Sequence, residues 1–296
     1  DAPAAPVAGL GAQLMAIVPV NPFQALAGGE TLSVIVFALM LGTGVLLAGE
    51  AAQPVAVFAH AAGQAILRAV RLVMELAPLG VLALVANAVG RHGLAVFANL
   101  SLLAIGLSCG VLFQIGVVQG LLVRLGGRMA PAFYFRAIVA AVLVAFSTTS
   151  SAAPLPVSLR VAHERLRLPP ALSNAVIPLG ASIARDGTGI YVGLLCTFAA
   201  QAFGIALTPA DYLVLVVGAV LLSLGAAGVP SAALFMLSGV LSLIGVTEQQ
   251  TAAIVALILP FDRLLDMIRT VPNVTANLAV ATVVTRHDAP HQGDPL

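Results

Sequence analysis

The sequence predicts an all-α polytopic membrane protein built from inverted repeats. Three observations carry this prediction. Of the 296 residues, 60% are hydrophobic and only 8% are charged, whereas a soluble domain carries about 25% charged residues. Several apolar runs reach the ~20 residues that a helix needs to cross a bilayer. Two further pairs of shorter apolar runs are each joined by small residues and a proline.

The N-terminal part of the chain is expected to be a loop followed by helical spans. Residues 1–20 are expected to be a loop or linker. Apolar runs at 31–49 and 56–90 predict two spans, and a third run covers 94–124.

Two interrupted segments predict re-entrant helical hairpins. Runs at 132–147 and 155–162 flank STTSSAAP, and runs at 211–225 and 231–245 flank GAAGVPS. Each run is too short to span comfortably, so each pair is expected to enter the membrane and return on the same side. Non-helical backbone at that depth is tolerated only where protein or water satisfies it. Two such interruptions in matching positions of two half-sequences are typical of transporters built from inverted repeats.

The segment 170–204 is expected to be a broken transmembrane helix. It carries SIARDGTGIY, residues 182–191, between strongly apolar stretches. Gly187 and its neighbours are expected to interrupt the helix in mid-membrane, so that the unwound turn can line a site.

The last helix is expected to cover residues 248–286, and one of its faces is polar. Its polar positions are Asp262, Asp266, Arg269, Thr270, Asn273 and Asn277. They recur at spacings of three and four, which places them on one side of a helix. They could pair with one another and only join helices, but ionisable residues inside a membrane usually mark a substrate pathway. A carboxylate can bind an ammonium group and a guanidinium can bind a carboxylate, so the pattern favours a zwitterion with an additional acidic group.

Charge and cysteine content argue against several other functions. The net charge of +1 gives no basis for nucleic-acid binding. Cys109 and Cys196 lack the close spacing of metal or redox pairs, so no metal site is expected. Arginines gather in the loops of one side, and the positive-inside rule makes that side cytoplasmic, with the polar tail at 287–296. The expected location is the inner (plasma) membrane.

Four segments, in chain order, resemble signature segments of the glutamate transporter family, the dicarboxylate/amino acid:cation symporters. They are SSAAPLPVSLRVA, IPLGASIARDGTGIY, AAGVPSAALFML and DRLLDMIRTVPNVTAN. In addition, VPVNPFQALAGGETL resembles the segment that leads into the fourth span of the family. The resemblance covers nearly the whole chain, and it implies that the first three spans of the family would precede Asp1.

The resemblance implies a homotrimer in which each protomer carries its substrate as an elevator. Residues 21–90 would belong mostly to a trimerisation scaffold and residues 94–286 mostly to a mobile transport domain. The two hairpins would cover 132–166 and 209–244. The implied activity is transport of glutamate or aspartate across the bilayer, not catalysis, and no catalytic residue is expected.

The resemblance also assigns substrate contacts residue by residue. Asp266 would bind the substrate amino group and Arg269 its side-chain carboxylate. Ser151 would lie at the α-carboxylate and Thr188 near the side-chain carboxylate. The remaining expected contacts are Thr270, Asn273 and the backbone of Val229.

The cation sites of the family are matched only in part. Sodium-coupled members carry Asn-Met-Asp-Gly-Thr where this chain has ARDGT, residues 184–188. An aspartate of the family is replaced by Asn277, and a threonine by Ala226. Because a guanidinium stays charged at any relevant pH, Arg185 is expected to be a tethered substitute for a bound cation and to neutralise Asp186. Its alternative role is to reach an interface or to pair structurally.

The expected function is therefore sodium-independent transport of an acidic amino acid, with no cofactor and with Arg185, Asp186 and Asn277 as the candidate cation-site residues. Sodium- or proton-coupled symport is the alternative within the family, with cystine or a dicarboxylate as alternative cargo. An intramembrane hydrolase using Ser150 or Ser151 would need a base within reach. A channel is a further alternative.

Overall fold

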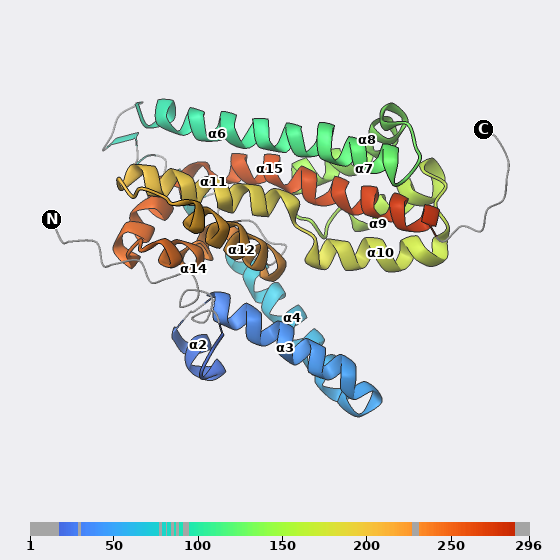
Figure 1. Ribbon diagram of the computed structural model, residues 1–296, viewed down its shortest axis with the longest axis horizontal. Helices are drawn as coiled ribbons and strands as arrows, with labels where there is room; N and C mark the ends of the chain where they lie inside the picture. Colours follow the sequence, from blue (N-terminus) through green and yellow to red (C-terminus); the bar gives the residue numbers. More distant parts are fainter. Residues whose placement is uncertain are drawn as a thin grey trace.

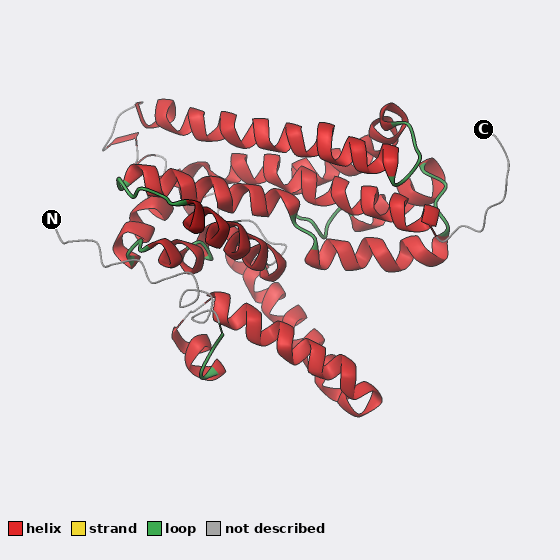
Figure 2. Cartoon of the chain, viewed as in Figure 1, coloured by secondary structure: helices red, strands yellow, loops and turns green. Residues whose placement is uncertain are grey.

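The computed structural model describes residues 18–28, 31–76, 79–80, 82–83, 86, 89–90, 95–226 and 231–287. Within these ranges every regular element is a helix, which confirms the all-α prediction (Figure 2). A helix satisfies its backbone hydrogen bonds within one segment, as a membrane requires. Among the described residues, three helical stretches are long and apolar enough to cross a membrane: Leu32–Ile66, Ser101–Leu125 and Pro131–Thr148.

The N-terminal helices form an arm that projects from the rest of the chain (Figure 1). The arm consists of α2 (Pro22–Gly28), α3 (Thr31–Ala48), the 3-10 turn η1 (Gly49–Ala52) and α4 (Gln53–Met74). The chain turns after α3 at Gly49, whose φ of +62° is a left-handed conformation that glycine adopts without steric cost. Leu46 and Leu47 of the arm are 81% and 82% exposed. Such an apolar surface suits lipid or another protein chain.

The remaining helices pack around α15 (Glu248–His287), which lies in the middle of their layer (Figure 1). In chain order they are α6 (Ala95–Phe113), the π-helix η2 (Gln114–Gln119), α7 (Gly120–Leu125), α8 (Pro131–Thr148), α9 (Leu155–Arg160), the π-helix η3 (Val161–Arg165), α10 (Pro170–Ile183), α11 (Asp186–Ala202), α12 (Pro209–Gly225), α13 (Ala232–Phe235), α14 (Ser238–Leu241) and the 3-10 turn η4 (Ser242–Ile244). Of these, α8, α10 and α11 make the most extensive contacts with α15.

The interrupted segments of the sequence correspond to separate helices. α8 and α9 contact each other across a turn at 149–154. α10 and α11 are separated by Ala184 and Arg185. The division of the chain into a scaffold and a transport domain stays a prediction.

Two apolar clusters bracket the polar face of α15. Ile258 joins the first cluster, where it packs with Leu195 of α11 and its neighbours, and Leu278 joins the second, which contains Tyr134 of α8. All four side chains are fully buried. Because lipid tails are as apolar as these side chains, close packing holds such clusters together in a membrane. The polar residues at 262–273 therefore lie between two tightly packed regions.

Candidate functional site

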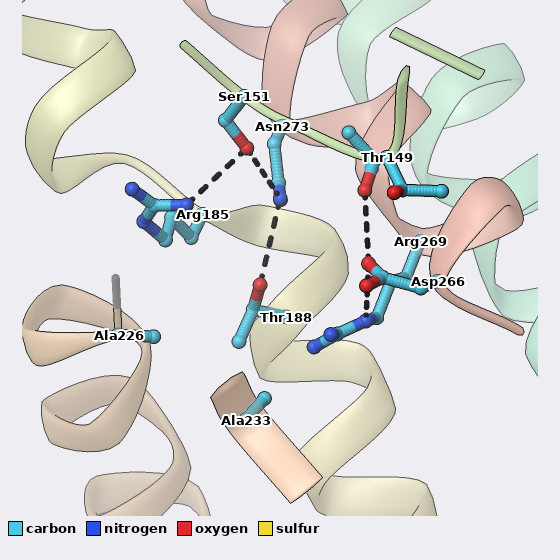
Figure 3. Close-up of a pocket in the computed structure, with 10 residues that line it drawn as sticks. Thr149, Ser151, Arg185, Thr188, Ala226, Ala233, Asp266, Arg269 and Asn273 are labelled. Carbon is cyan, nitrogen blue, oxygen red and sulfur yellow. Dashed lines mark hydrogen bonds and ion pairs between the residues drawn. The ribbon is translucent and has the colours of Figure 1, made fainter. Parts of the chain in front are cut away.

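A small pocket lies between the turn after α8, the start of α11 and the polar face of α15 (Figure 3). The empty space that its lining residues surround is about 250 Å³, including space open to solvent. The lining residues are Thr149, Ser151, Arg185, Thr188, Ala226, Ala233, Asp266, Arg269, Thr270 and Asn273. Most of these side chains are polar, although the surrounding helices are apolar.

The turn after α8 brings Ser151 to the pocket. α8 ends at Thr148, and Thr149 follows in the left-handed conformation with a φ of 51°. Ser151 is buried, and its Oγ accepts hydrogen bonds from Nη1 of Arg185 and Nδ2 of Asn273, both at 3.3 Å. One hydroxyl thus connects this turn to the break before α11 and to α15.

The break between α10 and α11 lies at Ala184 and Arg185. Arg185 has φ −137° and ψ 64°, outside the helical region, and α11 begins with the next residue. Gly187 lies in the first turn of α11, where its N–H donates to Oδ1 of Asn273 at 2.8 Å. A Cβ at Gly187 would collide with the carbonyl oxygen of Arg269. The predicted interruption of the helix is therefore confirmed and lies at the neighbouring residues Ala184 and Arg185. Gly187 itself is helical, and its missing Cβ permits a close approach of α11 to α15.

Asp266 and Arg269 form a buried ion pair on α15. Nε of Arg269 lies 2.9 Å from Oδ1 of Asp266, and both residues are 3% exposed. Oδ1 also accepts a hydrogen bond from the hydroxyl of Thr270 at 3.1 Å, and Oδ2 accepts one from the backbone N–H of Ser231 at 3.1 Å. Ser231 directly precedes α13, so this last bond ties the second interrupted segment to α15.

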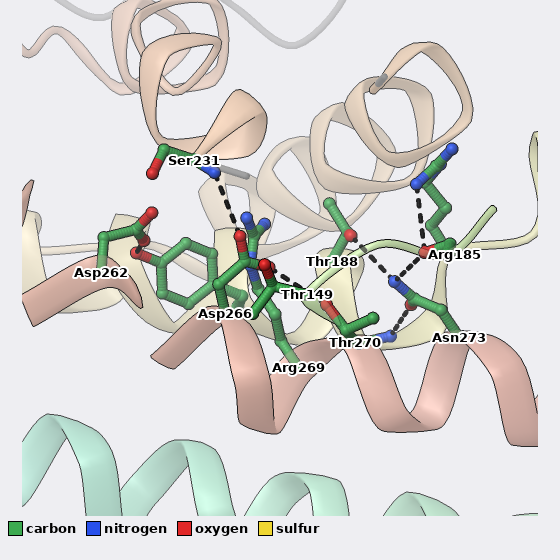
Figure 4. A network of polar contacts seen from close by, with 12 residues as sticks. Thr149, Arg185, Thr188, Ser231, Asp262, Asp266, Arg269, Thr270 and Asn273 are labelled. Atoms are coloured by element: carbon green, nitrogen blue, oxygen red, sulfur yellow. Dashed lines mark hydrogen bonds and ion pairs between the residues drawn. The ribbon is translucent and has the colours of Figure 1, made fainter. Parts of the chain in front are cut away.

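Tyr191 and Asp262 complete the surroundings of Arg269, and Figure 4 labels Asp262 and Arg269. The guanidinium carbon of Arg269 lies 4.7 Å from the centre of the Tyr191 ring, a favourable cation–π arrangement. The hydroxyl of Tyr191 donates to Oδ1 of Asp262, and both residues are fully buried. Arg269 is therefore held between one carboxylate and one aromatic face.

Asp186 turns away from the pocket. Its Oδ2 accepts a hydrogen bond from Nε2 of Gln114 at 2.6 Å, and Gln114 begins the π-helix η2, an element that is frequent at functional sites. Within the described ranges no ion pair joins Arg185 to Asp186, so the expected neutralisation of Asp186 by Arg185 is wrong. Arg185 has non-helical backbone angles and points its side chain into the pocket, whereas Asp186 opens α11 and faces η2.

Asn277 also lies apart from the pocket lining, further along α15. It is 4% exposed, and its Oδ1 has no hydrogen-bond partner among the described residues. This oxygen faces Gly180 of α10 so closely that a Cβ there would push against it. Ala184, at the break, offers no side-chain oxygen.

The structure brings most of the expected substrate contacts together. The residues that line one pocket are Ser151, Thr188, Asp266, Arg269, Thr270 and Asn273. Arg185 lines the same pocket, whereas Asp186 and Asn277 do not. Val229 lies outside the described residues. The substrate-binding roles of these residues stay predictions.

Three residues that shape the site were not predicted from the sequence. Thr149 lines the pocket, Gln114 holds Asp186, and Tyr191 stacks on Arg269. Gln114 could have been found, because a polar side chain inside an apolar span is itself a functional signal. Thr149 and Tyr191 carry no comparable signal, since their roles depend on which helix each one meets.

We expect Gln114→Leu to lower the melting temperature of the purified full-length protein in detergent. The variant removes the 2.6 Å donor of Asp186, and stranding a polar group in this way costs about 1–3 kcal/mol. Adding Asp186→Asn should recover most of the loss, because it removes the stranded charge. Gln201→Leu, at an exposed position of α11, is the matched control. An equal melting temperature for Gln114→Leu and the control would contradict this hydrogen bond.

The residues that build the pocket belong to a stretch matched by a single family model. The model of the sodium:dicarboxylate symporter family covers residues 1–287. The chain belongs to this family. The family resemblance of the four sequence motifs is thereby confirmed.

Several curated proteins are similar over most of the chain. The chain is 34% identical over 271 residues to the proton/sodium-glutamate symport protein of Bacillus subtilis, covering 91% of this chain and 62% of that protein. It is 34% identical over 283 residues to the C4-dicarboxylate transport protein of Azorhizobium caulinodans, covering 96% and 62%. It is 32% identical over 280 residues to the proton/glutamate-aspartate symporter of Bacillus subtilis, covering 92% and 64%. The chain thus spans a little under two thirds of the length of these relatives, whose names describe transport and not catalysis.

Proposed function

We propose that this protein is a secondary transporter of acidic amino acids, glutamate or aspartate, that works by alternating access. The observation that carries the proposal is the buried Asp266–Arg269 pair in the wall of a small polar pocket. A buried ion pair is weak evidence for a stabilising role, and charged residues inside a membrane usually mark a substrate pathway. In this proposal Asp266 receives the substrate ammonium group and Arg269 receives the side-chain carboxylate.

The hydrogen bonds of Asp266 leave room for this ammonium group. An ionised carboxylate can accept about four hydrogen bonds. Oδ1 of Asp266 faces Arg269 and Thr270, whereas Oδ2 receives one bond, from Ser231. The second lone pair of Oδ2 is therefore the proposed acceptor for the substrate.

The names of the relatives support this class of cargo. They include glutamate, glutamate-aspartate and C4-dicarboxylate transport. Amino acids are preferred over dicarboxylates because Asp266 would meet a cationic group only in an amino acid. C4-dicarboxylates are the second candidate, because they too carry two carboxylates that the guanidinium groups of Arg185 and Arg269 could match.

The proposal extends to sodium independence. Sodium binds oxygen ligands, and anionic ones attract it most strongly. At positions where sodium-coupled members of the family have an aspartate and an asparagine, this chain has the neutral Asn277 and Ala184. In place of the sodium ion, Arg185 would supply a positive charge that cannot dissociate. Coupling to sodium or protons, as named for the relatives, is the alternative.

Uptake of radiolabelled aspartate or glutamate into proteoliposomes tests the proposal. We expect uptake by the full-length protein to be unchanged when choline replaces sodium, since no sodium ion would take part. Proton and potassium gradients imposed in turn would identify a coupling ion, with protein-free liposomes as the control. A steep sodium dependence would restore sodium-coupled symport. Absence of uptake or binding of acidic amino acids and C4-dicarboxylates would refute the transport proposal itself.

An elevator mechanism and a homotrimer are further parts of the proposal. The exposed apolar arm of α3 and α4 is the surface proposed to meet lipid and neighbouring protomers, and the layer around α15 is proposed to move. The tail after α15 is proposed to lie in the cytoplasm. Native mass spectrometry of the detergent-solubilised protein would contradict the trimer if it found monomers alone.

The geometry around Ser151 gives no support to a hydrolase. Its Oγ accepts hydrogen bonds from Arg185 and Asn273, and neither a guanidinium nor an amide can take up the proton of a nucleophile. His163 contacts Ser173 instead, at 2.9 Å.

A further inference from the structure

Two arginines line the pocket, and their surroundings differ. Arg269 pairs with Asp266 at 2.9 Å and stacks on Tyr191. Arg185 is also buried, at 8% exposed. Its Nη1 donates to the neutral hydroxyl of Ser151 at 3.3 Å, and its Nε has no hydrogen-bond partner among the described residues. Among the residues that the structure describes, no carboxylate lies within ion-pairing distance of Arg185.

A buried guanidinium without a carboxylate partner would be stabilised by a bound anion. Burial of a charge without a counterion is strongly unfavourable, and a guanidinium cannot lose its proton to escape the penalty. A long arginine side chain can sometimes reach a polar interface, but Arg185 ends in the pocket wall. The missing counterion is therefore expected to come from a molecule that enters the pocket.

The two guanidinium groups lie at opposite ends of the pocket. Figures 3 and 4 both place Thr188 between Arg185 on one side and the Asp266–Arg269 pair on the other. Nδ2 of Asn273 donates to Ser151 at 3.3 Å and to Thr188 at 3.4 Å, so hydrogen-bonded polar groups lead from the Arg185 end as far as Thr188. This arrangement is complementary to a short molecule with a carboxylate at each end.

We propose that Arg185 binds the α-carboxylate of the acidic amino acid, together with Ser151, while Arg269 holds the side-chain carboxylate. The inference rests on the proposed function and deepens it. In this inference the permanent positive charge of Arg185 pairs with the substrate carboxylate and not with Asp186. A ligand that lacks either carboxylate would leave one guanidinium at its end of the pocket unmatched.

Binding of aspartate and its two mono-amides to the purified full-length protein tests this assignment. Asparagine lacks the side-chain carboxylate, and isoasparagine lacks the α-carboxylate. The unmodified protein should bind both amides about 100-fold more weakly than aspartate. Arg185→Gln should weaken aspartate binding by about 100-fold and change isoasparagine binding by less than about threefold, because that ligand has already lost the carboxylate in question.

Further variants separate a contact with substrate from a structural role. Arg185→Lys keeps the charge but not the planar fork, so it should give a smaller loss with the same selectivity between the two ligands. Arg263→Gln makes the same change at an exposed position of α15 and should bind like the unmodified protein. Equal weakening of aspartate and isoasparagine by both Arg185 variants, or unchanged aspartate binding in Arg185→Gln, would overturn the assignment. In either case binding by the unmodified protein would leave the proposed transport function standing.

Discussion

Arg269→Ala is expected to abolish high-affinity binding and uptake of acidic amino acids. The variant removes the group proposed to hold the side-chain carboxylate, and it strips Asp266 of its ion-pair partner at 2.9 Å. Truncating one partner of a buried charge pair across a binding interface costs about 2–5 kcal/mol, which corresponds to about one and a half to four orders of magnitude in affinity. Competition against radiolabelled aspartate in proteoliposomes of the full-length protein would measure the loss.

Binding of neutral amino acids shows whether Arg269→Ala has lost substrate specificity or has failed to fold. A neutral amino acid has no side-chain carboxylate to pair with Arg269. In the Arg269→Ala variant that guanidinium is gone, so the affinity for neutral amino acids relative to acidic ones should rise. Arg263→Ala on the same helix is exposed and should behave as the unmodified protein does. Acidic substrates that still bind with full affinity to Arg269→Ala would refute the role assigned to this residue.

Gly187→Ala is expected to destabilise the protein and to disrupt the pocket together. A Cβ at this position would overlap the carbonyl oxygen of Arg269 and lie 2.6 Å from Cγ of Pro272. Neither neighbour can yield without moving α11 away from α15, because one is backbone and the other a rigid ring. Overpacking of this kind costs about 1–3 kcal/mol, and sometimes more. The shift would also strain the 2.8 Å bond from the N–H of Gly187 to Asn273.

Two other glycines of α11 provide matched controls. A Cβ at Gly189 or Gly193 would meet no atom within 4 Å. Because alanine favours the helix over glycine by about 1 kcal/mol, Gly189→Ala and Gly193→Ala should keep or raise the melting temperature and leave substrate binding intact. If Gly187→Ala matched these controls in both measurements, the close contact between α11 and α15 would be disproved.

The polar face of the last helix could be predicted because it depends on local geometry. Residues three and four apart share a helix face wherever the helix lies, so Asp266, Arg269 and Asn273 were placed together by their spacing alone. The excess of apolar over charged residues likewise made helices the expected elements, since a membrane requires internally satisfied backbone. The gathering of Ser151 and Thr188 around that face required the family resemblance, because no spacing connects positions so distant in the chain.

The sequence by itself thus determined the class of the fold, the interrupted helices and the set of charges on one helix face. The tertiary structure alone decided which partner each charge meets: Asp186 meets Gln114, Arg269 meets Tyr191, and Arg185 is left facing the pocket. Adjacent residues such as Arg185 and Asp186 look like an ion pair in the sequence. The turn of the backbone between them sends their side chains to different neighbours, and the packing of helices far apart in the chain sets which neighbours those are.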